Sequence, residues 1–465
     1  MSNEKGRGSF TGSMGFVMAA AGSAVGLGNI WRFPYLAAKD GGGVFLFCYV
    51  ILAITFGFAL LSTEIAIGRK TQQSPLTAYG MLHKKWKGLG VLASVVPAII
   101  LPYYCAIGGW VLKYLYTYVT GNAESAVADG YFTGFITQVE APLIWMFIFL
   151  AVTIGITVAG VEKGIEKCSR ILMPILFVLI ICIAVFALTL SYTDGSGATR
   201  TGLQGLKYYV VPDFTGITFG KLLSTIMDAL GQLFFSISVS MGIMVAYGSY
   251  ARKDTNLMQS VNRIEIFDTL VAFLAGVMII PAVFTFTGLE GMNAGPSLMF
   301  ISLPKVFHAM GGVGLVIGIL FFVLVTFAAV TSSVSIAEAI TSGIIDKFGV
   351  SRKKGTILVG LYALVVGAIV CLGYNVFYFE YTLPNGAVAQ VLDILDYISN
   401  NLFMPLVALL TCVHIGWVVK PKTIIDEITL GGYKFHREKL YIAMVKFVAP
   451  VLLVVLLLQS FGLFK

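Results

Sequence analysis

The stretch GSAVGLGNIWRFP, from Gly22 to Pro34, places unusual groups inside the first apolar segment of the chain. It carries three glycines, the amide of Asn29 and the guanidinium of Arg32, where an ordinary membrane helix has Leu, Ile and Val. Glycine permits non-helical dihedrals, so this segment can break in mid-membrane and uncover its peptide groups. Freed carbonyls suit a hard cation and freed N–H groups suit a carboxylate. Close packing of small residues is the alternative, but Asn29 and Arg32 need partners at membrane depth and favour a binding site.

Three other apolar segments carry polar groups of similar chemistry. AAVTSSVSIAE (328–338) has four hydroxyls that could complete an oxygen cage for Na⁺, although such hydroxyls also bond back to their own helix. FFSISVSMG (234–242) interrupts the sixth segment with three serines. Asp268 is a lone acid that must be protonated or matched to a cation. Tyr103 and Tyr104 offer a phenol to a ligand carboxylate, against the alternative of an aromatic packing pair.

Composition identifies an all-α polytopic membrane protein. Hydrophobic residues make up 58% and charged residues 12% of the chain, and the mean hydropathy is +0.89. A soluble domain has about a quarter of its residues charged. Apolar windows long enough for a crossing of about 20 residues lie at 13–38, 43–68, 89–119, 142–160, 166–190, 220–250, 264–288, 311–345, 355–377, 388–418 and 440–462.

The positions of Lys and Arg predict the orientation. Most of the 31 basic residues fall in loops on the side of the N-terminus, so the positive-inside rule makes that side cytoplasmic. Eleven crossings then place the C-terminus outside, and we expect a multi-pass protein of the cell inner (plasma) membrane. The six cysteines form no CxxC pair and the four histidines are scattered, so neither a disulfide nor a metal-ligand spacing is indicated.

The segments group into two halves within a single domain, 1–465. The first half spans 12–190, the second 220–419, and one helix, 440–462, follows. Five segments per half make the halves enter the membrane from opposite sides, and the first segment of each is interrupted. That pattern points to the binding site of a secondary transporter. The segment 293–307, amphipathic and too short to cross, is either a lid over an outer vestibule or an ordinary capping loop.

Two other classes of function fit less well. A channel needs a continuous polar lining, whereas the polar groups here cluster at one depth with charged residues at both ends. A membrane hydrolase needs a nucleophile with a base in reach, and His414 is the only histidine at membrane depth. Transport is therefore the favoured interpretation, and an enzyme is not expected.

Four motifs together resemble the neurotransmitter:sodium symporter family. They are GSAVGLGNIWRFPY, YY followed by GGW in the third segment, FFSISVSMG followed by YGSYARKD, and AAVTSSVSIAE. The resemblance covers about residues 7–417 and implies the LeuT fold, with a 5+5 inverted repeat and unwound first and sixth helices. Eleven segments are similar to the prokaryotic branch that lacks a twelfth helix. The implied activity is Na⁺-coupled amino-acid import by alternating access, with no cofactor and an unknown oligomeric state.

The resemblance also implies two Na⁺ sites. The first would comprise Ala24, Asn29, Ser236 and Asp268. The second would comprise Gly22, Val25, Ala328, Thr331 and Ser332. Few charges and five or six oxygens suit Na⁺ better than a divalent ion. Asp268 departs from the commoner pattern, which has Asn there, and Ala272 stands where relatives place a serine or glutamate beside an anion site. Both departures predict chloride-independent transport.

The implied substrate site lies beside the first Na⁺ site. Its members would be Ala24, Gly26, Leu27, Gly28, Ile100, Tyr104, Phe235, Ser236, Ser238, Met241, Ser332 and Ile336. Gly26 is typical of amino-acid carriers, since monoamine carriers have an aspartate there. The apolar lining with a flexible Met241 favours a large hydrophobic or aromatic amino acid, with smaller aliphatic or other neutral amino acids as the alternative.

Charged residues at both mouths match the gates of the family. The outer pair would be Arg32 and Asp396; the inner pair would be Arg7 and Asp346, beside Tyr250. Exposed ion pairs contribute only about 0–1 kcal/mol each, which suits a gate that must open. Gly164 and Pro174 match a family motif for unwinding the inner end of the fifth helix, although a Gly and a Pro also make a plain kink.

Overall fold

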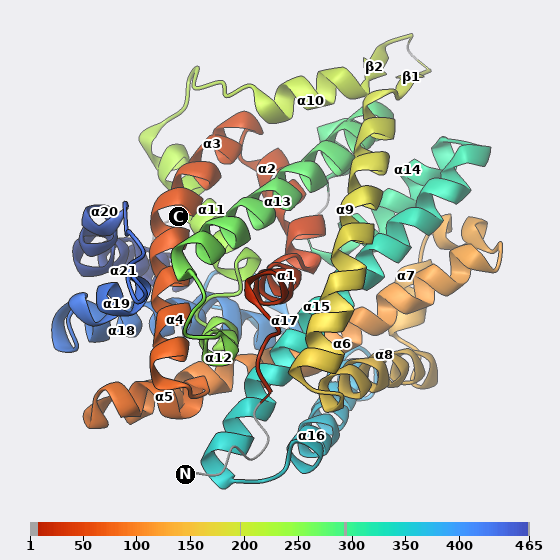
Figure 1. Cartoon of the computed structure of the whole chain (residues 1–465). Helices are drawn as coiled ribbons and strands as arrows, with labels where there is room; N and C mark the ends of the chain where they lie inside the picture. The colour runs from red at the N-terminus through yellow and green to blue at the C-terminus, as the bar shows by residue number, and fades with distance from the viewer. Residues whose placement is uncertain (1–7, 196, 293–294, 464–465) are drawn as a thin grey trace.

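Apolar helices long enough to cross a membrane make up most of the structure (Figure 1). The structure, a computed structural model, describes residues 8–195, 197–292 and 295–463. In these ranges nine helices meet the length and composition of a membrane span, and ten do when one bent pair counts as a single span. The predicted all-α polytopic class is therefore confirmed.

The helices before residue 190 are α1 (Ser13–Ala24), α2 (Phe33–Lys39), α3 (Gly43–Leu52), α4 (Phe58–Thr71), α5 (Pro75–Leu82), α6 (Lys87–Val119), α7 (Tyr131–Ile136), α8 (Glu140–Val158) and α9 (Lys167–Leu188). The later helices are α10 (Gly202–Val210), α11 (Phe219–Ser236), α12 (Ile243–Tyr250), α13 (Leu257–Thr287), α14 (Leu303–Ala309), α15 (Gly312–Phe348), α16 (Arg352–Leu372), α17 (Val391–Asp396), α18 (Met404–Val413), α19 (Lys422–Ile428), α20 (Glu438–Ala443) and α21 (Ala449–Ser460). Turns of π-helix continue several of them, at Gly28–Arg32, Ala53–Gly57, Val161–Glu166, Leu298–Ser302, Tyr397–Phe403, His414–Val418 and Met444–Val448.

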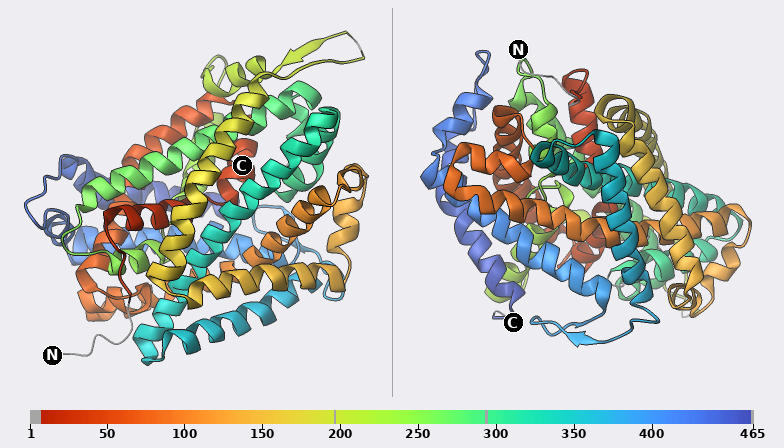
Figure 2. Two further views of the ribbon diagram at one scale, coloured as in Figure 1. Left: turned by 45° about the vertical axis from the view of Figure 1, so that its right-hand side comes forward. Right: turned by 90° about the horizontal axis from the view of Figure 1, so that it is seen from below.

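Two short antiparallel hairpins are the sheet structure of the described ranges. β1 (Ser191–Thr193) pairs with β2 (Thr199–Thr201), and β3 (Tyr381–Thr382) pairs with β4 (Val388–Ala389). The β1–β2 hairpin and α10 lie at one end of the bundle, and α5 and the start of α16 lie at the opposite end (Figures 1 and 2). We call the first the hairpin end and the second the α5 end.

The sixth predicted segment, 220–250, does not form a continuous span. It forms α11 and α12, with the non-helical residues 237–242 between them. The first segment is also broken, because α1 and the helix that starts at Gly28 meet at an angle of 53°. Both interruptions were predicted from glycines and serines in otherwise apolar sequence.

Close helix packing holds the broken helices in the centre of the bundle. α12 lies along α4, and α1 contacts α13, α15 and α9; Figure 1 shows α1 beside α9. A Cβ atom on Gly68 would lie 2.0 Å from the Val245 carbonyl oxygen, and one on Gly248 would lie 2.3 Å from that of Ile65. These two glycines therefore let the backbones of α4 and α12 touch, as small residues commonly do between membrane helices.

The segment predicted as a lid, 293–307, forms a π-helical turn and α14 over its described residues, which begin at 295. The Phe300 ring packs against Trp31 with centroids 6.5 Å apart, and the Tyr114 hydroxyl donates to the Phe300 carbonyl at 2.9 Å. The segment thus rests on the second half of the broken first helix and on α6.

Candidate functional site

The break in the first helix brings polar groups together at the centre of the bundle. α1 ends at Ala24, Val25 has extended dihedrals (φ −78°, ψ 94°), and the Gly26 N–H donates to the Asn29 side chain at 3.4 Å. Gly28 lies against a neighbouring aromatic ring, since a Cβ there would be 2.3 Å from Phe235. The uncovered backbone was anticipated from the glycines of this stretch.

The break between α11 and α12 is held open by a side chain that the sequence analysis did not select. Ser238 and Ser240 have left-handed dihedrals, with φ of 53° and 64°. The Ser240 N–H, freed by the unwinding, donates to the buried Glu64 carboxylate at 2.6 Å. Glu64 could have been found as a lone acid in the apolar second segment, the same signal that identified Asp268.

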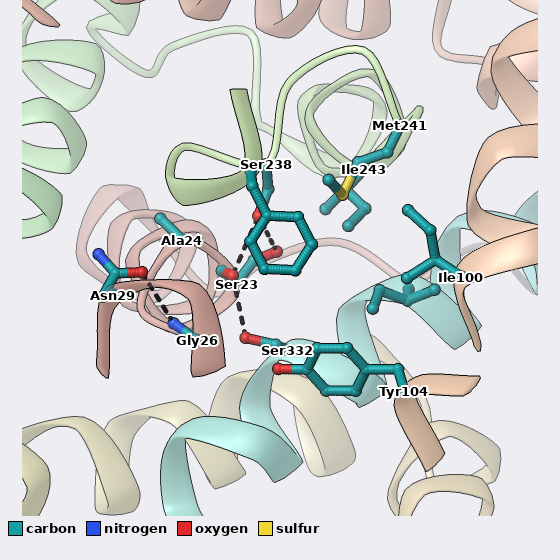
Figure 3. Close-up of a pocket in the computed structure, with 12 residues that line it drawn as sticks. Ser23, Ala24, Gly26, Asn29, Ile100, Tyr104, Ser238, Met241, Ile243 and Ser332 are labelled. Atoms are coloured by element: carbon teal, nitrogen blue, oxygen red, sulfur yellow. Dashed lines mark hydrogen bonds between the residues drawn. The ribbon is translucent and has the colours of Figure 1, made fainter. Parts of the chain in front are cut away.

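A small cavity of about 20 Å³ lies between the two breaks (Figure 3). That is near the minimum for one water molecule, so flexible side chains must move to admit a larger ligand. The predicted residues that line it are Ala24, Gly26, Ile100, Tyr104, Phe235, Ser238, Met241, Ser332 and Ile336.

The lining differs from the prediction in a few positions. Ser23 and Ile243 line the cavity but were not predicted, and Asn29, predicted only for the first ion site, lines it too. Leu27, Gly28 and Ser236 were predicted for the substrate site but do not line this cavity. The Leu27 N–H instead donates to the Tyr104 hydroxyl at 3.5 Å, Gly28 packs on Phe235, and Ser236 points into the first ion cluster.

Hydroxyl groups connect the two breaks across this cavity. The Ser238 hydroxyl donates to the Ser23 carbonyl at 3.0 Å, and the Ser23 hydroxyl donates back to Ser238 at 3.1 Å. Ser332, on α15, donates to the same Ser23 carbonyl at 3.1 Å. Figure 3 shows Ser332 beside Tyr104, on the side of the cavity opposite Met241. Ser23 thus joins α1, the α11–α12 break and α15 at one point.

The first predicted ion cluster is assembled in the structure, with one addition. The Asp268 carboxylate accepts hydrogen bonds from Asn29 Nδ2 at 3.0 Å and Ser236 Oγ at 2.7 Å. Tyr49, the addition, donates to Ser236 at 3.0 Å and to Asp268 at 3.2 Å. All four side chains are fully buried, and Ala24 lies next to Asn29 in the cavity lining. A carboxylate, an amide and hydroxyls in this arrangement suit a hard monovalent cation.

Only part of the second predicted cluster meets at the break in the first helix. The Ser332 hydroxyl lies 3.4 Å from the Val25 carbonyl oxygen. Thr331, its neighbour, instead donates within α15, to the Ala328 and Phe327 carbonyls at 3.1 Å each. The Gly22 backbone faces α9, where a Cβ would lie 3.2 Å from Ser169 Oγ. The geometry joins Ser332 to the break directly, whereas Thr331 shows the helix-bonding alternative.

A larger cavity of about 240 Å³ lies toward the hairpin end and has Arg32 and Asp396 in its lining. We call it the vestibule. Tyr104 and Phe235 line both the vestibule and the central cavity and therefore separate them. Among the ion pairs of the described residues, none within 4.0 Å joins Arg32 to Asp396. Asp396 accepts instead from the Asn400 amide at 2.5 Å, so the predicted outer pair is not closed in this conformation.

A different set of charges lies at the α5 end. Arg7 is outside the described residues, and Asp346 accepts from the Ser74 N–H at 2.6 Å. Tyr250 donates to Glu338 at 2.5 Å.

Arg352 makes two bonds to that same Glu338, at 2.8 and 2.7 Å, with the carboxylate fully buried. Sequence reasoning missed this Glu338–Arg352 pair, because the two residues lie on separate segments and only the fold brings them together.

Gly164 and Pro174 lie in continuous helical structure. Gly164 is in the π-helical turn Val161–Glu166, where a Cβ would lie 2.1 Å from the Ile156 carbonyl oxygen, and Pro174 is inside α9. Gly164 therefore permits a close backbone contact here, and unwinding at this motif stays a prediction.

Comparisons with known proteins agree with this geometry. The chain matches the sodium:neurotransmitter symporter family over residues 7–129 and 132–465. It is 34% identical over 458 residues to the sodium-dependent transporter YhdH of Bacillus subtilis, covering 97% of each chain. It is 25% identical over 488 residues to the human sodium- and chloride-dependent GABA transporter 2, covering 92% of this chain and 76% of the relative.

A solved structure shows the same fold. The crystal structure of MhsT in complex with L-phenylalanine has a TM-score of 0.85 and 35% identity, and the match covers 98% of this chain and 100% of that one. The LeuT fold predicted from the motifs is thereby confirmed, and the chain is a multi-pass membrane protein and not an enzyme. The chain belongs to the sodium:neurotransmitter symporter family, whose members are sodium-coupled transporters.

Proposed function

We propose that this protein imports a large hydrophobic or aromatic amino acid together with Na⁺, independently of chloride. The observation that carries the proposal is the central cavity, in which polar backbone and hydroxyl groups occupy one side and Ile100, Met241, Ile243 and Ile336 occupy the other. Such a division suits a zwitterion with an apolar side chain. The solved relative MhsT was crystallised with L-phenylalanine.

The two breaks supply the groups that an amino acid requires. Its carboxylate would lie near the Leu27 N–H and the Tyr104 hydroxyl, which already lie within 3.5 Å of one another. Its ammonium would face the carbonyls and hydroxyls around Ser23 and Ser238. A Cβ at Gly26 would lie 2.7 Å from Ser332 Oγ, so the aspartate that a monoamine carrier has there would displace this hydroxyl from its present position.

The two oxygen clusters are the proposed Na⁺ sites. Asn29, Ser236 and Asp268 would hold one ion beside the substrate, and Ser332 with the Val25 carbonyl would hold the other. We further propose that the N-terminus is cytoplasmic and that the two halves form a 5+5 inverted repeat. The hairpin end would face the outside and the α5 end the inside, and the two ends would open in alternation.

Uptake into proteoliposomes tests the proposal. Purified protein should accumulate labelled L-phenylalanine, L-tyrosine or L-tryptophan with an inward Na⁺ gradient, and not with choline or K⁺. A thermal-shift screen of the twenty amino acids in Na⁺ and in K⁺ identifies the substrate class first, since a ligand bound to the folded state raises the unfolding temperature. Selective stabilisation by alanine or glycine would favour the smaller-substrate alternative. Equal accumulation in choline would refute Na⁺ coupling.

A further inference from the structure

Exposed apolar side chains, most of them aromatic, gather on the loop between α16 and α17. The loop spans 373–390, contains the β3–β4 hairpin and follows a helix that crosses from the α5 end to the hairpin end. Figure 2 (right) shows this hairpin at the edge of the bundle, beside the C-terminus. The exposed apolar side chains, 46–63% exposed, are Val376, Phe377, Tyr378, Phe379, Tyr381 and Val388. We call them the aromatic surface. Patches of this kind mark contacts with another molecule or with a membrane.

The aromatic surface continues the lipid-facing side of α16. This helix has the length and composition of a membrane span. The exposed apolar residues along one side of it, at the three- and four-residue spacing of a helix face, are Leu358, Leu361, Val365 and Ile369. The Phe377 N–H donates to the Leu372 carbonyl at 2.9 Å, so the chain still turns beyond the end of α16. The exposed apolar side of the span therefore leads directly into the aromatic surface.

The composition and backbone of the loop suit the boundary between lipid and water. Glu380 is the one charged residue from 355 to 390, and the Tyr378 hydroxyl donates to it at 2.5 Å. A two-stranded hairpin has open edges, which do not occur in the hydrocarbon core, whereas aromatic residues are enriched at the membrane–water interfaces. The β1–β2 hairpin differs, because it carries an Arg200–Asp194 ion pair and the exposed Thr199. One hairpin is thus suited to the interface and the other to water.

The inward side of the loop is fixed to the helices behind it. Ala389 belongs to a small buried cluster with Tyr397. The Tyr397 hydroxyl donates to the Ser460 carbonyl, at the end of the last helix, at 2.6 Å. A Cβ on Gly462 would lie 2.8 Å from the Pro384 carbonyl oxygen, in the turn between β3 and β4. The loop therefore transmits a restraint from its exposed side to the residues that follow α17.

We propose that the aromatic surface inserts into the lipid–water interface of the leaflet at the hairpin end and restrains α17. Lipid is the partner, because the surface continues the exposed side of a span, carries one charge and is rich in aromatic rings. α17 follows β4 with only Gln390 between them, and it carries Asp396 to the vestibule. A loop held by lipid limits the movement of Asp396 relative to Arg32. The lipid contact rests on the membrane location of the chain alone, and only this last step rests on the proposed function.

The depth of the surface is measured with a spin label on the full-length protein in vesicles of palmitoyl-oleoyl phosphatidylcholine. The label is placed at Val388→Cys, and at Thr199→Cys as the matched control on the β1–β2 hairpin. The background is Cys168→Ala/Cys182→Ala, because the other four cysteines are buried, and the background without a new cysteine gives the blank. Oxygen partitions into lipid and an aqueous nickel chelate does not, so the ratio of their collision rates should be at least about fivefold higher at residue 388 than at residue 199.

Two results would overturn the lipid contact. A label at residue 388 that collides with the nickel chelate as often as the label at residue 199 would place the surface in water. Exclusion of both reagents, with dipolar broadening that disappears on dilution with unlabelled protein, would show that a second copy of the chain covers the surface. Neither result depends on substrate or Na⁺, so failure of the proposed function leaves this test intact.

The restraint on α17 is tested by hydrogen exchange in the same vesicles. The triple variant Phe377→Ser/Phe379→Ser/Tyr381→Ser should speed exchange of the amides of residues 391–396 at least about threefold, because fewer apolar groups hold the loop at the interface. The control replaces three other exposed apolar residues near the start of α11, Val211, Phe214 and Phe219, with serine, and should leave that exchange unchanged. Equal exchange in the unmodified protein and the triple variant would overturn the restraint.

Discussion

Replacing Asp268 with Asn tests whether a fixed negative charge holds the first Na⁺. The side chain is fully buried and accepts bonds from Asn29, Ser236 and Tyr49 at 3.0, 2.7 and 3.2 Å. The asparagine carbonyl oxygen can still accept from Asn29 and Ser236, and its NH₂ group can donate to the Tyr49 oxygen. The Tyr49 hydroxyl can still donate to Ser236 at 3.0 Å. We therefore expect the free energy of unfolding to change by about 1 kcal/mol or less.

The effect on Na⁺ should be much larger. Two unit charges about 4 Å apart attract by about 4 kcal/mol at an effective dielectric constant of about 20. The cost of burying an ionised carboxylate offsets part of this attraction. We expect a net loss of about 1.4–2.8 kcal/mol, which raises the Na⁺ concentration for half-maximal uptake about 10- to 100-fold.

The assay is Na⁺-dependent uptake in chloride and in gluconate. The unmodified protein should transport equally in both, because Asp268 supplies the negative charge that a bound anion supplies elsewhere. Asp268→Asn should be sensitive to chloride. An Asn variant with unchanged Na⁺ dependence in both media would show that Asp268 is protonated or only structural, and would refute the charge-compensation argument.

Three further substitutions test other parts of the site. Met241→Phe should shift preference toward smaller aliphatic amino acids, because the ring takes up cavity volume; an unchanged rank order in competition assays would contradict this. Gly28→Ala should strongly reduce uptake, because its Cβ would lie 2.3 Å from the Phe235 ring, and normal uptake would show that the ring moves freely. Arg69→Met should lower the free energy of unfolding by about 3–5 kcal/mol, because it leaves the buried Glu427 carboxylate without a partner. In the unmodified protein this carboxylate lies 2.7 Å from the guanidinium. Adding Glu427→Gln should restore part of that loss.

The fold was predictable because its signals are local. Apolar windows of sufficient length predicted the spans, and glycines and serines within two of them predicted the breaks. The break between α11 and α12 also explains why that segment fails a simple test for a span. Glu64 carries the same local signal as a lone acid in an apolar segment, but its partner, the backbone N–H of Ser240, is a free donor only after unwinding.

The site was partly predictable for the same reason. Asp268 and Asn29 attract notice by residue type alone, and the structure joins them at 3.0 Å. Ile243 has no such signal, because an isoleucine after a glycine reads as ordinary apolar sequence. The Glu338–Arg352 pair needs the packing of α15 against α16 to become visible. Asp268 was therefore found from its residue type, whereas the Glu338–Arg352 contact forms only when two segments pack together.

The hydrogen bonds between the two breaks give a physical reason for coupling between ions and substrate. Ser23 bonds to Ser238, in the α11–α12 break, and to Ser332, on α15, and Asn29 bonds to Ser236 and Asp268. An ion in either cluster therefore orders residues that also line the central cavity. A substrate that binds an already ordered cavity loses less conformational entropy. By the same linkage, the substrate must raise the affinity for Na⁺ by the factor by which Na⁺ raises the affinity for the substrate. The two affinities should therefore change together in any variant that disrupts these bonds.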